Sequence, residues 1–303
     1  MKILLAIDSS SLSEAIVREV EQRPWPPETT VCVLTVIDLL AMTSAVGYLE
    51  PFIKGENEAA NQLVQKVAER LERRDLKATA LAIEGYPGTT VVEQAESWGA
   101  DFVFVGSHGH GGFVRFLLGS IAKAVVQNAP CSVEIVRRPA ADDPATARAG
   151  SRRILLATDG SEFSMAAAQS IAQRPWPDGS EFRIVSVVEE VLAALGPWHV
   201  AGAIARRVRH DSRERCEQAV NTAGEILTGA GVSFDNVVLD GSPKKRIVEE
   251  AKEWGADILV VGSHGRRGLT RYLLGSVSEA VAMHAYCSVE VIRDRSLLGG
   301  VRR

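Results

Sequence analysis

The sequence predicts an α/β protein of two tandem domains, each a five-stranded parallel sheet with helices on both faces. First, the 303 residues include two copies of one unit: Asp159 repeats Asp8 at a distance of 151 positions. Trp254 repeats Trp98 at a distance of 156. Second, short apolar runs alternate with amphipathic segments in each copy, as strands alternate with helices in βαβ units. Third, apolar runs such as residues 102–105 are continuous, which is typical of strands buried on both faces.

The length of the repeat indicates duplicated domains, because solenoid repeats are roughly 20–50 residues long. We expect a first domain at residues 1–138, a linker at 139–151 that is rich in Pro, Ala and Asp, a second domain at 152–294 and a tail at 295–303. A duplicated domain often replaces a homodimer, so the copies are expected to pack as an intramolecular pseudo-twofold pair. A homodimer of the whole protein is a further possibility.

Hydrophobic spacing places the elements of the first copy, and the second copy repeats each of them. Strands are expected at residues 2–7, 31–37, 78–83, 101–105 and 131–136. Helices are expected at 11–22, 56–74, 91–98 and from 120 towards Pro130, with 41–55 irregular. Gly99 follows the third helix and suits the residue after a helix end, where a left-handed backbone is common.

The last strand of each copy alternates polar and apolar residues, which suits the edge of a sheet. Glu134 and Glu290 occupy matched positions in these strands. They are read as charges that guard an exposed edge, or else the two edges pair with each other across the repeat.

Composition and charge limit the classes of protein to which the sequence can belong. The sequence is 46% hydrophobic and 24% charged, as soluble globular proteins are. A net charge of −4 argues against a nucleic-acid groove, and no apolar run approaches the roughly 20 residues of a membrane span. The first strand reaches Asp8 too soon for a signal peptide. The scattered cysteines indicate reduced thiols in a cytoplasmic protein; they are Cys32, Cys131, Cys216 and Cys287.

The fourth strand of each copy runs into a series of glycines and then into a helix that begins near a serine. Two glycines three positions apart are followed, after nine residues, by Gly-Ser, with identical spacing in both copies. These residues are Gly106, Gly109, Gly119 and Ser120, and then Gly262, Gly265, Gly275 and Ser276. Glycines let backbone N–H groups approach an anion, and a helix N-terminus carries partial positive charge. The pattern predicts a phosphate cradle.

Ligands of open α/β sheets bind beyond the carboxyl ends of the strands, where the strand order reverses. Asp8 and Asp159 end the first strands, and Gly106 and Gly262 end the fourth. If the first and fourth strands are neighbours, as a flavodoxin-like order with this switch point would make them, each Asp faces a glycine loop. Each Asp then caps the following helix, or contacts a ribose hydroxyl or a phosphate-bound cation.

Further side chains around the loops have more than one reading. Ser120 and Ser276 are candidate helix caps, and Glu279 completes a capping box with Ser276. Arg115 and Arg271 are either solvated surface groups or screen phosphate charge.

His108 and His264 are read as loop histidines with at most a hydrogen bond to a ligand, because no matched acid or nucleophile lies near them in sequence. No catalytic residue is therefore assigned. The sequence contains neither a Walker A loop nor a G-x-G-x-x-G after the first strand.

The glycine signature, the opening strand that ends in Asp, the Gly-Ala-Asp before the fourth strand and the closing Cys-Ser-Val resemble the universal stress protein family over nearly the whole sequence. The resemblance implies a HUP-type α/β fold and one ATP per copy. It places Asp8 and Asp159 near the adenosine or a Mg²⁺ ion. The ATP contacts that it implies are Asp8, Val36, Gly106, Gly109, Gly119, Ser120, Asp159, Val187, Gly262, Gly265, Gly275 and Ser276. The loop residues His108, Arg115, His264 and Arg271 are added to the candidate ATP contacts from their positions in the sequence.

The resemblance also implies a nucleotide-dependent regulator in the stress response. The alternatives are a slow Mg²⁺-dependent ATPase or phosphotransferase that uses the same pockets, or an interaction module whose glycine loops are relics. Ser9 stands where the second copy has Gly160, so equal affinity of the two sites is not assured.

Overall fold

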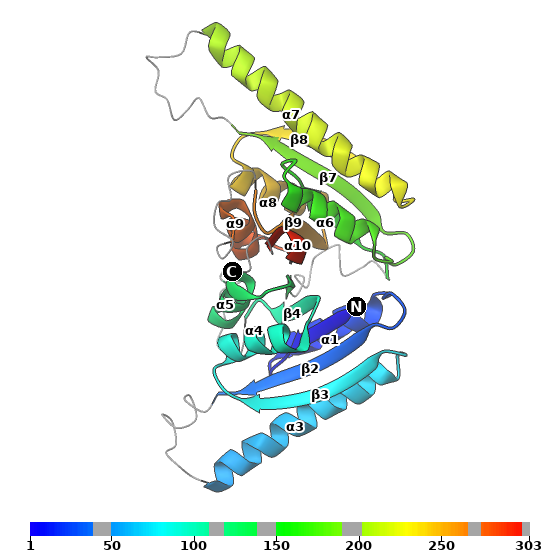
Figure 1. The fold of residues 1–303 in the computed structure, drawn as a ribbon, viewed down its shortest axis with the longest axis vertical. Coiled ribbons are helices and arrows are strands. Elements are labelled where there is room, and N and C mark those ends of the chain that lie inside the picture. The colour runs from blue at the N-terminus through cyan, green and yellow to red at the C-terminus, as the bar shows by residue number, and fades with distance from the viewer. Residues whose placement is uncertain (39–49, 109–117, 138–149, 190–201, 266–273, 299–303) are drawn as a thin grey trace. The chain divides into compact units, whose positions relative to one another are not determined.

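A computed structural model describes residues 1–38, 50–108, 118–137, 150–189, 202–265 and 274–298 (Figure 1). The protein divides into two compact units, Met1–Arg138 and Pro139–Arg303. The first unit contains β1 (Lys2–Ala6), α1 (Ser11–Gln22), β2 (Thr30–Ile37), α3 (Glu50–Glu72), β3 (Lys77–Glu84), α4 (Pro87–Trp98), β4 (Phe102–Gly106), α5 (Ser120–Asn128) and β5 (Ser132–Val136).

The second unit repeats this order of elements. It contains β6 (Arg153–Ala157), α6 (Glu162–Ala172), β7 (Glu181–Val188), α7 (Gly202–Gly229), β8 (Asp235–Asp240), α8 (Pro243–Trp254), β9 (Ile258–Gly262), α9 (Ser276–His284), β10 (Ser288–Ile292) and α10 (Arg295–Leu298). The four-residue helix α10 lies in the segment expected to be a tail.

Within the first unit the strands are parallel and lie in the order β3-β2-β1-β4-β5. The second unit has the corresponding order β8-β7-β6-β9-β10. This order differs from the 2-1-3-4-5 of flavodoxin-like sheets. The predicted switch point is nevertheless present, because β1 and β4 are direct neighbours, with Leu4 beside Val103. Their carboxyl ends therefore open onto one crevice.

Helices cover both faces of the first sheet. α1 packs on β4 and β5 and α3 on β2 and β3, whereas α4 and α5 pack against each other. Arg70 of α3 forms ion pairs with Glu14 and Glu21 of α1, so these two helices lie side by side. The central strands are sealed between the layers: Leu4 and Leu5 are fully buried. The α/β fold predicted from the alternating pattern is confirmed.

The repeated Arg-Pro-Trp-Pro segment anchors the loop after the first helix of each unit. The indole N–H of Trp25 donates to the carbonyl of Val20 at 2.8 Å, and its ring meets Phe104 edge-on at 5.9 Å. Trp176 donates to the carbonyl of Ile171 at 2.9 Å in the second unit. The tryptophan thus ties the end of the helix to the core.

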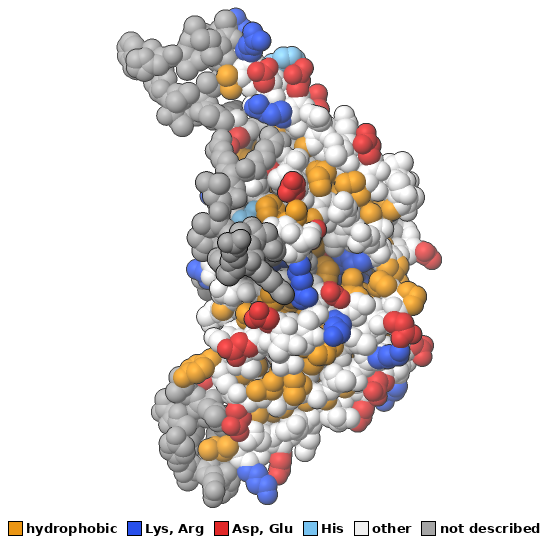
Figure 2. All heavy atoms as spheres, viewed as in Figure 1, with side chains coloured by type: hydrophobic (Ala, Val, Ile, Leu, Met, Phe, Trp, Pro, Cys, Tyr) orange, Lys and Arg blue, Asp and Glu red, His pale blue; other side chains and the backbone are white. Residues whose placement is uncertain are grey.

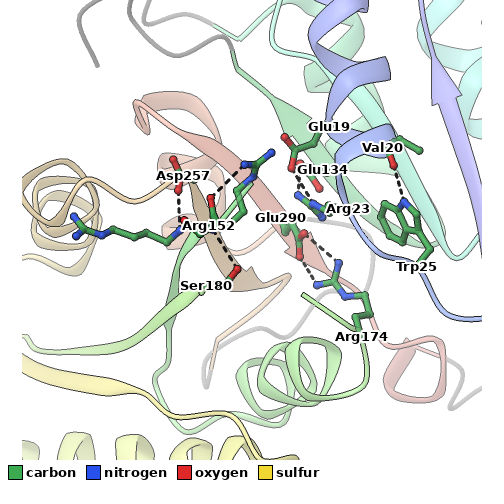
Figure 3. A network of polar contacts seen from close by, with 12 residues as sticks. Glu19, Val20, Arg23, Trp25, Glu134, Arg152, Arg174, Ser180, Asp257 and Glu290 are labelled. Atoms are coloured by element: carbon green, nitrogen blue, oxygen red, sulfur yellow. Dashed lines mark hydrogen bonds and ion pairs between the residues drawn. The ribbon is translucent and has the colours of Figure 1, made fainter. Parts of the chain in front are cut away.

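The reading of Glu134 and Glu290 as surface charges is wrong. Both carboxylates have 0% exposure and each is paired with the arginine of the Arg-Pro-Trp-Pro segment (Figure 3). Arg23 Nη2 lies 2.8 Å from Glu134 Oε1. Arg174 donates to both oxygens of Glu290, at 3.1 and 2.6 Å. The polar position of the last strand therefore points into its own unit. Pairing between the two edges stays a prediction.

Two helix starts also differ from expectation. α3 begins at Glu50, so the end of the segment expected to be irregular is helical, while residues 41–49 lie outside the described part of the protein. α4 begins at Pro87, one turn earlier than predicted, because proline at the first helical position needs no N–H acceptor. Among the described helices, none is both long and apolar enough to cross a membrane.

Charged side chains are mixed over the surface. On the face drawn in Figure 2, acidic and basic groups of the described residues are interspersed with hydrophobic ones. That part of the surface carries no broad basic area of the kind that nucleic acids bind.

Candidate functional site

A cavity of about 440 Å³ lies at the carboxyl ends of β1 and β4 in the first unit. This volume falls within the range of roughly 300–1,000 Å³ typical of small-molecule sites. Apolar side chains of β2 and α1 form one part of the wall, and the start of α5 forms another. The lining residues are Ala6, Ile7, Asp8, Ser10, Leu12, Ser13, Ile16, Leu34, Val36, Pro87, Val91, Val105, Gly106, His108, Gly119, Ser120, Ile121 and Ala122.

Asp8 is held in the cavity wall by the first turn of α1. Its Oδ1 accepts hydrogen bonds from the N–H of Ser10 at 2.9 Å and from the hydroxyl of Ser13 at 2.8 Å. The Ser13 hydroxyl oxygen in turn accepts from the N–H of Asp8 at 2.8 Å. Ser10 is the N-cap of α1, yet its side chain makes no cap bond. The carboxylate of Asp8 therefore orders this helix start, which is the capping role considered for it.

The start of α5 presents main-chain donors to the cavity. Ser120, Ile121 and Ala122 form the first turn of α5 and line the cavity. Their N–H groups have no acceptor within the helix, because the first turn lacks the preceding carbonyls. The N–H of Gly119 is already used: it donates to the carbonyl of Ser107 at 2.7 Å. Three amides, all from the helix, are therefore placed to meet an anion.

The prediction that Ser120 and Ser276 cap their helices is wrong. The N-cap residues are Gly119 and Gly275, and neither helix start has a side-chain cap bond. Ser276 is the first helical residue, so its hydroxyl does not form the predicted capping box with Glu279. Each helix starts one residue earlier because the N-cap amide bonds to the strand loop, as Gly275 does to the carbonyl of Ser263 at 2.8 Å.

Packing of the protein on itself accounts for part of the glycine pattern. A Cβ on Gly106 would lie 2.8 Å from Leu12 Cδ2, and one on Gly119 would lie 3.2 Å from the carbonyl oxygen of Ser107. Both contacts are tighter than ordinary van der Waals distances. These glycines permit α1 and α5 to approach β4, so the signature has a structural role in addition to any role at a ligand.

Two polar atoms in this cavity wall are buried without a hydrogen-bond partner. They are Ser10 Oγ and His108 Nε2. The other ring nitrogen of His108 lies 3.1 Å from Ser107 Oγ. Burial, together with the positive charge of Arg137, lowers the pKa of His108 from its ordinary value of 6.5, so the ring is neutral at pH 7. An unpaired buried polar atom costs about 1–3 kcal/mol, and a polar ligand would offset that cost.

The same positions pack differently in the second unit. Ser161 is the N-cap of α6 and accepts from the N–H of Ser164 at 3.3 Å. The hydroxyl of Ser164 hydrogen-bonds with that of Thr158 at 3.0 Å, where the first unit has Ile7. Asp159 still accepts from the N–H of Ser161, at 3.0 Å. The helix start is therefore capped by a serine, and the hydroxyls satisfy one another.

Around the second glycine loop, side chains pack closely on one another. The rings of Phe163 and His264 are 4.9 Å apart, and His264 is only 6% exposed. The hydroxyl of Ser278 donates to the carbonyl of Gly262 at 2.6 Å. A Cβ on Gly265 would lie 2.7 Å from Asp159 Oδ2, so this Asp does face the glycine loop as predicted.

The structure thus brings together six of the candidate residues in the first unit: Asp8, Val36, Gly106, His108, Gly119 and Ser120 all line the cavity. Gly109, Arg115 and Arg271 lie outside the described residues. Sequence reasoning missed Ser10, Ser13 and Pro87. The spacing Asp-x-Ser-x-x-Ser at the start of a predicted helix was the available signal for the two serines.

No group of three or more metal-ligating side chains lies together among the described residues. Asp8 and Asp159 each supply one carboxylate to their crevices. Mg²⁺ is often held by one or two carboxylates with the remaining ligands from phosphate and water. A protein-only metal site is thus not formed in the described ranges, whereas a nucleotide-borne Mg²⁺ is compatible with a single Asp.

Comparisons with known proteins match both copies of the repeated unit. The family model described as "Universal stress protein family" matches residues 1–137 and 150–293. A universal stress protein of Mycolicibacterium smegmatis is 29% identical over 302 residues, and the match spans 97% of both proteins. One of Mycobacterium tuberculosis is 31% identical over 221 residues, which is 73% of this protein and 70% of the relative.

A solved universal stress protein of Archaeoglobus fulgidus has a TM-score of 0.64 and 21% identity, and the match spans 96% of both proteins. At that identity the likeness concerns the fold alone. The family model, in contrast, matches both copies almost from end to end. The protein therefore belongs to the universal stress protein family, as a tandem of two such domains.

Proposed function

We propose that the cavity of the first unit binds ATP and that the protein is a nucleotide-dependent regulator in the stress response. One observation carries this proposal: unpaired donors and acceptors meet in a single cavity. The first turn of α5 supplies three N–H groups, and Ser10 Oγ and His108 Nε2 are buried there without partners. Membership of the universal stress protein family supports the stress-response role.

The two ends of the cavity suit the two ends of ATP. Leu34 and Val36 supply an apolar wall for the adenine. The first turn of α5 suits the phosphates, because helix N-termini favour anions. Asp8 follows β1, which lies between β2 and β4, so its carboxylate suits a ribose hydroxyl or a Mg²⁺ ion that the phosphates carry. The bound ion would neutralise part of the triphosphate charge.

A slow Mg²⁺-dependent ATPase or phosphotransferase is the second candidate, and one observation favours it. His108 lines the cavity, its ring is neutral at pH 7 and its buried Nε2 has no hydrogen-bond partner, so a change of its side-chain rotamer would let it orient a water molecule. Asp8 is less suited to act as a base, since two hydrogen bonds engage its Oδ1. A turnover slower than roughly one per minute, against a median near 10 per second for enzymes, favours binding as the function.

Ser120 offers a direct test of the helix amides. Proline is tolerated at the first helical position, and Gly119 before it has φ −62° and ψ 156°, which a residue preceding proline can adopt. Ser120→Pro therefore removes one N–H without breaking α5. A hydrogen bond to a charged group is worth about 1.5–3 kcal/mol, so ATP affinity should fall roughly 10- to 100-fold.

Ser120→Ala is the matched control, because it removes the hydroxyl and keeps the N–H. Calorimetric titration with Mg²⁺-ATP measures both variants, and circular dichroism checks that each is folded. Equal affinity of Ser120→Pro and Ser120→Ala would show that the amide does not contact phosphate. A wild type without affinity at millimolar ATP would refute the binding proposal as a whole.

A further inference from the structure

On the basis of the ATP site proposed for the first unit, we infer that the two signatures are not equivalent. The first unit takes the nucleotide, whereas Phe163 closes the matching crevice of the second. The residue at this position, Leu12 in the first unit and Phe163 in the second, thus decides which copy binds. The inference rests on three differences in packing that lie outside the glycine signature.

The first difference is the spacing between helix and strand. Ile16 and Val17 of α1 are replaced by Ala167 and Ala168 in α6, and all four are buried. Smaller side chains let a helix approach its sheet more closely. Accordingly, a Cβ on Gly262 would lie 2.6 Å from both the carbonyl carbon and the carbonyl oxygen of Phe163.

The first unit has a wider gap at the matching place. The nearest atom to a Cβ on Gly106 belongs to a side chain, Leu12 Cδ2 at 2.8 Å, and not to the backbone of α1. Larger residues thus keep α1 further from β4. The space that remains is the part of the cavity lined by Leu12 and Ile16.

The second difference is the aromatic contact. Leu12 is a cavity wall in the first unit. At the matching position the Phe163 ring packs on His264 with centroids 4.9 Å apart and an interplanar angle of 44°. His264 is 6% exposed, whereas His108 is a half-buried cavity residue. The aromatic ring therefore covers the imidazole that a ligand of the second unit would have to reach.

The third difference is the satisfaction of polar groups. Ser10 Oγ has no partner, but its counterpart Ser161 Oγ accepts from the N–H of Ser164. Ala122 has no hydroxyl, but its counterpart Ser278 donates to the carbonyl of Gly262. In the second crevice these groups already bond within the protein. A nucleotide would have to replace existing interactions there and would gain less from binding.

Titration of the full-length protein with Mg²⁺-ATP tests this inference without any substitution. We expect one ATP per protein molecule. Hydrogen exchange with and without ATP should show protection of α1, β4 and α5 and no change in α6, β9 and α9. Two ATP molecules of similar affinity per protein molecule would overturn the inference and leave the proposed function standing. No ATP binding at all would overturn both.

Matched proline variants locate the single site. Ser120→Pro should weaken ATP binding at least 10-fold, and Ser276→Pro should leave affinity and stoichiometry unchanged. Gly275 has φ −60° and ψ 145°, so the second proline is as well tolerated as the first. A loss of affinity with Ser276→Pro and none with Ser120→Pro would assign the nucleotide to the second unit and overturn the inference.

Exchange of the residue types at Leu12 and Phe163 tests the role of this position in both units. Leu12→Phe should lower ATP affinity more than 10-fold by filling the first cavity, while Leu12→Met, which has a similar volume, should change it less than 3-fold. Phe163→Leu should add a second, weaker ATP per protein molecule. Binding of this second ATP must persist when Phe163→Leu is combined with Ser120→Pro, which weakens the site of the first unit. Unchanged affinity of a folded Leu12→Phe variant would refute the role of this position.

Discussion

Alanine at the glycine that ends the fourth strand should destabilise the second unit much more than the first. In Gly262→Ala the new methyl group would lie 2.6 Å from the carbonyl carbon and oxygen of Phe163 and 2.9 Å from the backbone nitrogen of Ser164. Backbone atoms in a packed helix cannot move away individually. The whole start of α6 would have to shift, against the buried alanines that hold it on the sheet.

In Gly106→Ala the closest atom is the end of a flexible side chain. The methyl would lie 2.8 Å from Leu12 Cδ2, and Leu12 borders a cavity of about 440 Å³ into which it can turn. The strain is therefore small. Replacing glycine in a strand also gains about 0.5–1 kcal/mol of backbone entropy. We expect Gly106→Ala to change the free energy of unfolding by less than about 1 kcal/mol.

Overpacking of a well-filled core costs about 1–3 kcal/mol, and occasionally more. Taking about 3 kcal/mol for contacts with backbone atoms and subtracting the entropic gain leaves a loss of about 2 kcal/mol for Gly262→Ala. That corresponds to a roughly 30-fold rise in the unfolding constant of the second unit. The first unit should keep its stability, since the close contacts of the new methyl group, with Phe163 and Ser164, all lie within the second unit.

Hydrogen exchange followed by mass spectrometry measures the two units separately in the intact protein. Amides of β6 and β9 should exchange roughly 30-fold faster in Gly262→Ala under conditions where exchange follows global opening of the unit. Amides of β1 and β4 provide the internal reference. Equal losses in the two variants would contradict the idea that α6 lies closer to its sheet than α1.

Two further predictions concern the Arg174–Glu290 ion pair and the imidazole of His108. Arg174→Met should lower the free energy of unfolding by about 3–5 kcal/mol, because Glu290 is fully buried and loses two hydrogen bonds. The double variant Arg174→Met/Glu290→Leu should recover most of this loss in urea unfolding. No recovery in the double variant would refute the pairing. The pKa of His108 lies below 6.5 in the free protein, and phosphates near Nε2 would raise it, so ATP binding should take up protons and tighten as pH falls towards 6.5. Calorimetry in buffers of different ionisation enthalpy measures this uptake, which His108→Gln should abolish and His264→Gln should not.

The positions of the strands along the sequence were predictable because strands buried on both faces are continuously apolar. Continuous apolar runs marked β4 and β9, and the two copies confirmed each other's boundaries. α1 occupies the expected residues, Ser11–Gln22. The adjacency of β1 and β4 was the condition on which the predicted crevice depended, and because the structure meets it the cavity lies where it was expected.

Glu134 shows what the alternation of polar and apolar residues along a strand cannot predict. Alternation of polar and apolar residues indicates that one side of a strand differs from the other, but not that the polar side meets water. The partner of Glu134 is Arg23, which lies 111 positions away and is invisible to local patterns. The repeat held the missing signal: both copies keep the same arginine and the same glutamate, at matched positions. A charge kept with its counter-charge in two divergent copies indicates a pair.

The prediction that Ser120 and Ser276 cap their helices was wrong for a different reason. Serine is a preferred N-cap residue, so local propensity placed the cap on it. In the fold, the N–H of the preceding glycine bonds to the loop after the fourth strand, at 2.7 Å for Gly119 and 2.8 Å for Gly275. A tertiary hydrogen bond thus sets the helix start. The serine then becomes the first helical residue, and its amide becomes available to a ligand.

The glycine signature describes the backbone that faces a ligand, and it is the same in both copies. Whether space exists beside that backbone depends on a different element, the first helix of each unit. There the copies diverge: Leu12 and Ile16 border a cavity, whereas Phe163 covers His264 and Ala167 lets the helix close on Gly262. Because van der Waals contact changes over less than about 1 Å, one side chain outside a motif, at the position of Leu12 and Phe163, can close the site that the motif predicts.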